Sequence, residues 1–148
     1  MGKERAGRVY IAVVALVLLT STYLRVLLGP LLPIPNAVAW PAGGVLLLVG
    51  FTISHRWHRL KARIYAGELV TEGVYAHVRH PHYSSIILMV LGAALLLQSL
   101  PALLFAILNV AILYQAAKEE EEHLLETHGA AYEEYMKKVR WRFIPWVI

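Results

Sequence analysis

The longest uncharged stretch of the chain, Tyr83–Ala117, limits what the chain can fold into. These 35 residues contain no Asp, Glu, Lys or Arg, which is typical of membrane-embedded sequence. A single helix over the whole stretch would extend about 52 Å, well beyond a hydrocarbon core of about 30 Å. Pro101 offers a natural break. We therefore predict two short spans, 84–97 and 101–116, joined as a hairpin by a tight turn that starts at Gln98.

Two further apolar segments, 9–28 and 37–54, precede this hairpin and are separated by a proline-rich loop that cannot continue a helix. The chain is 58% hydrophobic and only 16% charged, whereas soluble domains carry about 25% charged residues. We therefore predict an all-α integral membrane protein with one domain, 1–148. It would contain about four transmembrane helices, the last two a short hairpin, followed by C-terminal amphipathic helices.

Lys and Arg gather in three places: residues 3–8, 56–63 and 118–142. The positive-inside rule then predicts a multi-pass protein with both termini in the cytoplasm and the 29–36 loop outside. The first apolar run lacks a cleavage pattern and is interpreted as an anchor. A net charge of +4 favours the cytoplasmic lipid surface over nucleic acid as a partner. The pattern does not predict an oligomeric state.

Two polar segments, 67–83 and 118–142, would meet on the cytoplasmic face. In the first, Arg79 and His80 stand before Pro81, which is well suited to open a helix. An interfacial basic patch is the simplest interpretation. A helix start also leaves free N–H groups that bind anionic or acceptor atoms, however, and here a fixed charge and an adaptable donor flank them.

Four consecutive carboxylates, Glu119 to Glu122, open the second polar segment. They fit a solvated acidic face of a helix. Yet consecutive helical residues point about 100° apart, so one or two of them must turn toward the bundle. A carboxylate near the bilayer is costly without a partner. The candidate partners are Arg79, Arg142 or a cationic ligand.

The residue types also restrict the kinds of site that the chain can form. Cysteine is absent, which excludes disulfides, thiol nucleophiles and zinc–thiolate sites. Seven histidines could supply imidazole ligands, but no His-His pair of the type used by membrane di-iron enzymes is present. We therefore predict no metal site.

The segment Gly73–Tyr83, GVYAHVRHPHY, is followed by the predicted hairpin, then by EEHLLETHGAAYEEYMKKV (Glu121–Val139) and a terminal FIP. This order of motifs resembles the isoprenylcysteine carboxyl methyltransferase family and the related phospholipid N-methyltransferases. The resemblance covers about half of the chain, 67–145. It implies a membrane methyltransferase that uses S-adenosylmethionine at the cytoplasmic face. The acceptor would be lipophilic, either an isoprenylcysteine-type carboxylate or a lipid amine.

The resemblance also implies which residues form the site. Arg79 suits the carboxylate of the cofactor, and a glutamate suits its ammonium or ribose groups. Tyrosine can pack on the adenine or face the sulfonium, and Arg142 would hold an anionic acceptor. The implied cofactor-binding residues are Tyr75, Val78, Arg79, His80, Pro81, Tyr83, Glu120, Glu121 and Tyr132, and the implied catalytic residues are Arg142 and Glu121.

Two other functions remain open at this point. Some sterol reductases share a similar C-terminal design, so a membrane reductase using a nicotinamide cofactor is one alternative. A small four-span transporter or structural subunit is the other. A proton-coupled transporter should carry an acidic residue within a span, and none of the four predicted spans contains Asp or Glu.

Overall fold

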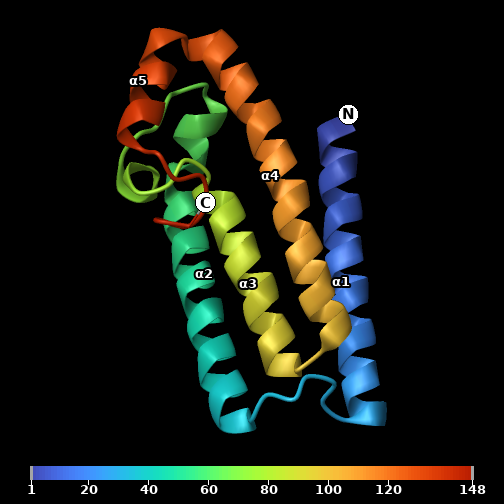
Figure 1. Cartoon of the computed structure of the whole chain (residues 1–148). Helices are drawn as coiled ribbons and strands as arrows, with labels where there is room; N and C mark the ends of the chain where they lie inside the picture. The colour runs from blue at the N-terminus through green and yellow to red at the C-terminus, as the bar shows by residue number, and fades with distance from the viewer. Residues whose placement is uncertain (1, 148) are drawn as a thin grey trace.

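The computed structural model describes residues 2–147, with side chains described from Val9 onward. No strand occurs among these residues, and the chain is a bundle of helices (Figure 1). The elements are α1 (Gly2–Leu28), α2 (Asn36–Tyr65), the short 3-10 helix η1 (Gly73–Ala76), α3 (Pro81–Leu97), α4 (Leu100–His128) and α5 (Ala130–Lys138). The all-helical prediction is confirmed.

Three of these helices, α1, α2 and α4, are long and apolar enough to cross a membrane. Helix α3 is apolar but shorter, with 17 residues, or about 25 Å. The uncharged stretch is divided where predicted, because Gln98 adopts a left-handed conformation after α3. Ser99 then caps α4 by accepting a hydrogen bond from the Ala102 N–H at 3.3 Å.

The predicted fourth span, 101–116, lies within the longer helix α4, and its end at 116 stays a prediction. Helix α4 continues without a break to His128, and only α5 is separate. The segment from Ala116 to His128 consists mainly of strong helix formers and contains no Gly or Pro. The helix therefore ends only at Gly129, which has φ +52°. Helix α2 likewise continues beyond the predicted span 37–54 and ends at Tyr65.

Helices α2 and α3 pack closely because glycine lies at their contact. A Cβ atom on Gly43 would approach the Gly92 carbonyl oxygen to 2.8 Å, and one on Gly50 would approach Met89 Cγ to the same distance. Small residues allow membrane helices to approach in this way. The close approach holds α3 against α2, and the N-terminal end of α3 is where the two polar segments meet.

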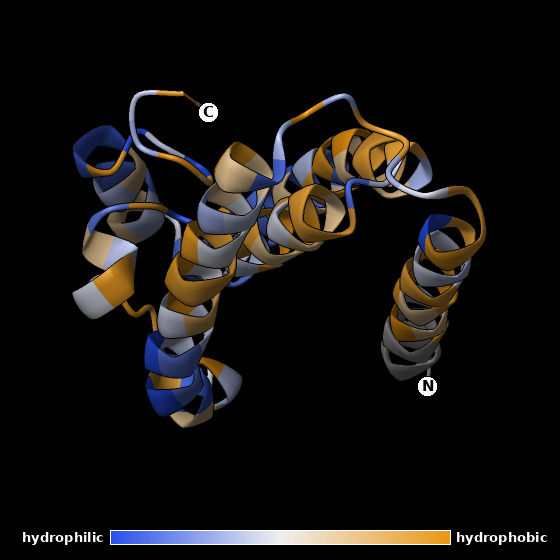
Figure 2. Ribbon diagram, turned by 90° about the horizontal axis from the view of Figure 1, so that it is seen from below, coloured by the Kyte–Doolittle hydropathy of each residue, from blue (hydrophilic) through white to orange (hydrophobic). Residues whose placement is uncertain are grey.

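Helix α1 stands to one side of the other helices (Figure 2), and few of its residues are buried. Two polar contacts hold it. Tyr10 donates a hydrogen bond to Asn109 Oδ1 of α4 at 2.8 Å. Arg25 donates to the Leu96 carbonyl oxygen at the end of α3 at 2.7 Å. Arg25 therefore satisfies a backbone carbonyl group at the C-terminal end of α3.

The fold leads to a topology prediction. The N-terminus, the 66–80 segment and α5 lie toward one end of the bundle, and the 29–35 loop with the turn at Gln98 lies at the other (Figure 1). We expect Pro33→Cys, the sole thiol in the chain, to react with an impermeant maleimide only from outside. Arg59→Cys is the matched control and should react only from the cytoplasmic side. Labelling of position 33 from the cytoplasm would contradict the topology.

Candidate active site

The C-terminal tail folds back onto the segment that precedes α3. The backbone N–H groups of Arg79 and His80 donate to the carbonyl oxygens of Trp141 and Arg142, each at 2.9 Å. Ser84 Oγ donates to the Phe143 carbonyl oxygen at 2.6 Å. The two segments are about sixty residues apart in the sequence, and these bonds hold them side by side. The tail therefore closes over the start of α3.

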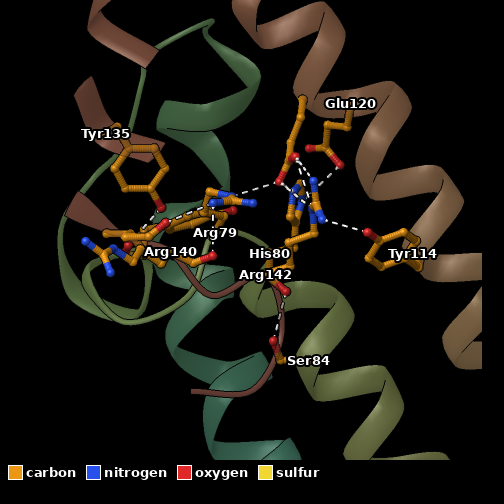
Figure 3. A network of polar contacts seen from close by, with 11 residues as sticks. Arg79, His80, Ser84, Tyr114, Glu120, Tyr135, Arg140 and Arg142 are labelled. Carbon is orange, nitrogen blue, oxygen red and sulfur yellow. Dashed lines mark hydrogen bonds and ion pairs between the residues drawn. The ribbon is translucent and has the colours of Figure 1, made fainter. Parts of the chain in front are cut away.

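Arg79, His80 and Arg142 belong to one network of polar contacts (Figure 3). All three contact Glu121, which is therefore the centre of a buried ion network. Its residue is only 5% exposed. Arg79 Nε donates to Glu121 Oε1 at 2.8 Å, and Arg142 Nη2 donates to Oε2 at 2.8 Å. His80 Nε2 lies 3.1 Å from Oε1. Because an ionised carboxylate can only accept, Nε2 carries the proton of this bond.

The partners of Glu121 are held in place by further bonds. Arg79 Nη1 donates to the carbonyl oxygens of Val139 and Arg140, each at 3.1 Å. Arg142 Nη1 donates to the Tyr114 hydroxyl at 2.9 Å, and its guanidinium lies 4.9 Å from the Tyr114 ring centroid. One of the consecutive carboxylates thus turns inward and pairs with both predicted arginines.

The network shifts the pKa values of its members. Burial alone would raise the pKa of Glu121, but hydrogen bonds from His80 and Arg142, with the nearby charge of Arg79, lower it to about 2. Burial would lower the pKa of His80, whereas its close contacts with the carboxylates of Glu120 and Glu121 raise it above the ordinary histidine value. Glu121 is therefore ionised at neutral pH, and the charged form of His80 is favoured.

Glu120 has a different environment, because it faces a cavity. Its side chain is 47% exposed, and its Oε2 lies 3.6 Å from His80 Nδ1. The cavity has a volume of about 200 Å³. A smaller cavity of about 50 Å³ shares Ile64, Tyr75 and Glu120 with the first. The two cavities are therefore adjacent parts of one hollow, and Glu120 is an acidic residue common to both.

Aromatic rings form much of the wall of the larger cavity. Trp57 Nε1 donates to the Tyr75 hydroxyl at 3.1 Å, and His82 stacks on Trp57 with ring centroids 4.1 Å apart. Tyr83 stacks on His80 at 5.5 Å. Flat rings around a carboxylate give a surface suited to a planar or cationic ligand.

The structure brings most of the predicted site residues together. Tyr75, His80, Tyr83 and Glu120 line the larger cavity, and Arg79 and Tyr132 line the smaller one. Val78 and Pro81 instead line a groove on the other side of the 77–82 segment, so their cofactor contacts stay predictions. The catalytic roles of Glu121 and Arg142 also stay predictions, since both side chains are engaged in the network.

Sequence reasoning missed Trp57 as a wall of the site. A signal was present: Gly43, Gly50, Trp57 and Ile64 follow one another at intervals of seven residues. That spacing places them on one face of a helix. Two of them are the glycines that pack on α3, so the same face carries Trp57 and Ile64 into the cavity.

Among the residues that the structure describes, no group of three or more His, Cys, Asp or Glu side chains is arranged to hold a metal ion. The groups that face the hollow are a carboxylate, an imidazole and aromatic rings, and a buried ion network supports them.

Comparison with curated proteins gives relatives of two kinds. The chain is 40% identical over 72 residues, 48% of its length, to a protein-S-isoprenylcysteine O-methyltransferase of Schizosaccharomyces pombe. It is 34% identical over 73 residues, 49% of its length, to protein-S-isoprenylcysteine O-methyltransferase B of Arabidopsis thaliana. It is also 32% identical over 82 residues, 54% of its length, to a delta(14)-sterol reductase of Mus musculus.

These similarities involve only part of each relative, namely 30% of the S. pombe protein, 37% of the A. thaliana protein and 20% of the mouse protein. No solved structure matches the chain. The family model for phospholipid methyltransferase matches residues 42–131, which include most of α2, all of α3 and α4, and the segment that carries Arg79 and His80. Because that match covers more than half of the chain, the chain belongs to the phospholipid methyltransferase family.

Proposed function

We propose that this membrane methyltransferase uses S-adenosylmethionine and methylates a lipophilic acceptor at the cytoplasmic face of its membrane. The observation that carries the proposal is the hollow between the two polar segments, where Glu120 and aromatic rings face the same space. The names of the two isoprenylcysteine methyltransferase relatives support the reaction class. The acceptor class, an isoprenylcysteine-type carboxylate or a lipid amine, is part of the proposal.

The residues present fit the cofactor in their chemistry. S-adenosylmethionine, when bound, supplies a methyl group on a cationic sulfonium. Glu120 offers a carboxylate for a positively charged or hydroxyl-bearing part of the molecule, and Trp57, Tyr75 and Tyr83 offer rings for stacking. Tyr132, whose buried hydroxyl has no hydrogen-bond partner among the described residues, lines the smaller cavity.

Within this proposal the chain contributes position and shielding. Glu121 holds Arg79 and Arg142 with charge-assisted hydrogen bonds, so both polar segments keep a fixed relative position. His80 is held between two carboxylates and is poorly placed to accept a further proton. The tail, anchored by buried Phe143, covers the network and excludes water. Preorganised geometry of this kind supplies much of the rate in a displacement reaction.

The proposed function is tested by methyl transfer. Purified protein is incubated with methyl-labelled S-adenosylmethionine and a total membrane extract, and the label is followed into lipid and protein fractions. We expect label in a lipophilic fraction, and about tenfold less of it with Glu120→Gln at limiting cofactor. Transfer that is equal in a heat-inactivated sample would contradict the proposal.

A nicotinamide-dependent reductase is the second candidate, because the mouse relative is a sterol reductase. The family match favours the methyltransferase. The two functions separate on the ligand, since tighter binding of a reduced nicotinamide than of S-adenosylmethionine would favour the reductase.

Arg142 supplies a separate prediction. Its guanidinium contacts both carboxylate oxygens of Glu121, and we propose that this grip orients the tail over the acceptor. Lysine cannot reproduce a two-point contact. We expect Arg142→Lys to lower turnover about tenfold or more at saturating cofactor, a loss of about 1.4 kcal/mol in transition-state stabilisation, while cofactor binding stays near normal. Arg140→Lys is the control, because the Arg140 side chain makes no ion pair with the described residues. Wild-type turnover in Arg142→Lys would overturn the role.

A further inference from the structure

A further hollow lies between α2, the 74–81 segment and the C-terminal tail. It is a groove of about 430 Å³, and it shares no lining residue with the cavity at Glu120. Its walls come from α2, from the 74–81 segment and from the C-terminal tail, and include Leu48, Val49, Arg56, His77, Pro81 and Phe143. The groove is therefore a separate feature of the fold, divided from the candidate active site by the 77–82 segment.

The groove is apolar at one end and basic at the other. Leu48 and Val49 lie in the membrane-spanning part of α2 and are exposed, at 67% and 43%. Arg56 lies two helical turns further along α2, or about 12 Å. Its guanidinium makes no hydrogen bond or ion pair with any other residue that the structure describes, and the lining contains no acidic residue. His77 adds an imidazole whose Nδ1 lies 3.2 Å from the Gly73 carbonyl oxygen, so Nε2 remains available.

The depth of the basic end follows from the tail. Pro145 lines the groove, and the next residues, Trp146 and Val147, are 84% and 72% exposed. An exposed tryptophan next to an apolar span is typical of the headgroup region. In a membrane with Trp146 in the headgroup region, Arg56 and His77 would lie at headgroup depth, and Leu48 and Val49 at the depth of the acyl chains.

From this arrangement we infer that the groove binds one anionic membrane lipid, with its phosphate at Arg56 and His77 and an acyl chain along Leu48 and Val49. The charge complementarity selects the occupant: an unpaired cation, no acid and an open apolar channel fit a lipid phosphate of the same leaflet. The lipid would contact the opposite side of the segment that carries Arg79 and His80. The inference does not depend on the methyl-transfer reaction.

The test measures lipid retention by native mass spectrometry of the full chain released from detergent. The probes are phosphatidylglycerol and phosphatidylcholine with identical acyl chains. We expect preferential retention of phosphatidylglycerol by the wild type. Arg56→Gln should reduce that preference roughly fivefold, the effect of about 1 kcal/mol per basic residue near an anionic surface. Val49→Trp fills the apolar end without changing charge and should also lower retention.

Arg59→Gln is the matched control, since Arg59 is an exposed residue of the same helix that contacts His55 and does not line the groove. It removes the same charge and should keep the preference. Equal retention of the two lipids by the wild type, or equal losses in Arg56→Gln and Arg59→Gln, would overturn the inference. Displacement of the bound lipid by inorganic phosphate would also overturn it, because the site would then recognise a free anion.

Discussion

Replacement of Glu121 by glutamine is expected to destabilise the protein by about 3–5 kcal/mol and to abolish methyl transfer. The substitution removes the charge that compensates Arg79 and Arg142, and Arg79 has a side chain that is only 9% exposed. Breaking a buried pair by removing one partner leaves an uncompensated charge, which costs more than the pair contributed. Thermal unfolding in detergent, followed with the intrinsic tryptophan signal, measures the loss.

Glu122→Gln is the control for this prediction. Glu122 is the next residue along α4, is exposed and makes no ion pair with the described residues, so the substitution should change the free energy of unfolding by less than about 0.5 kcal/mol. If Glu121→Gln unfolds at the wild-type temperature, the network does not hold the two polar segments together.

The effect of Glu121 should also depend on pH. Its pKa is about 2 in the folded protein, below the ordinary glutamate value of about 4.3. A group with a lowered pKa contributes stability above its unfolded pKa and loses that contribution as the pH falls toward the folded pKa. The stability difference between wild type and Glu121→Gln should therefore shrink between about pH 5 and pH 2. If the stability difference between the two proteins stays constant over that range, the pKa of Glu121 is not lowered in the folded protein.

Replacement of the neighbouring Glu120 by glutamine should have the opposite profile: a large loss of cofactor affinity with little loss of stability. Glu120 is half exposed, lines both cavities and forms only a long contact with His80, so we expect its charge to contribute little to stability. A hydrogen bond to a charged group is worth about 1.5–3 kcal/mol, which corresponds to about tenfold or more in the dissociation constant. Calorimetric titration with S-adenosylmethionine measures the change.

Glu119→Gln removes the same charge from the same helix, at an exposed residue that accepts a hydrogen bond from Gln115. We expect its affinity to match the wild type. Equal affinities in Glu119→Gln and Glu120→Gln would show that Glu120 does not contact the cofactor. In this account Glu120 binds the cofactor and Glu121 stabilises the fold, although the two residues are adjacent in sequence.

Local sequence predicted the features that depend on local chemistry. The length of the uncharged stretch required a break near Pro101, and the structure has one at Gln98 and Ser99. Pro81 begins α3 because its fixed φ suits the first helical turn. The angular spacing of consecutive helical residues required that one carboxylate of the acidic run turn inward, and that residue is Glu121.

Other features were not predicted, some because a local signal was overlooked and others because they depend on contacts between distant segments. Helices α2 and α4 extend past the apolar spans because nothing in the charged sequence ends a helix. The sequence named Arg142 as a candidate partner of an inward carboxylate, and the structure pairs it with Glu121. Its hydrogen bond to the Tyr114 hydroxyl was not predicted, because that contact depends on how the tail folds back. Trp57 belongs to a segment that matches no motif, so only its spacing from Gly50 pointed to it.

The most direct test of the account is a binding titration of the purified full chain with S-adenosylmethionine in competition with a reduced nicotinamide. We predict saturable binding of S-adenosylmethionine, weakened by Glu120→Gln and unaffected by Glu119→Gln, with no displacement by excess NADPH. Displacement by NADPH, or the absence of S-adenosylmethionine binding by folded protein, would contradict the claim that the hollow at Glu120 is a methyl-donor site.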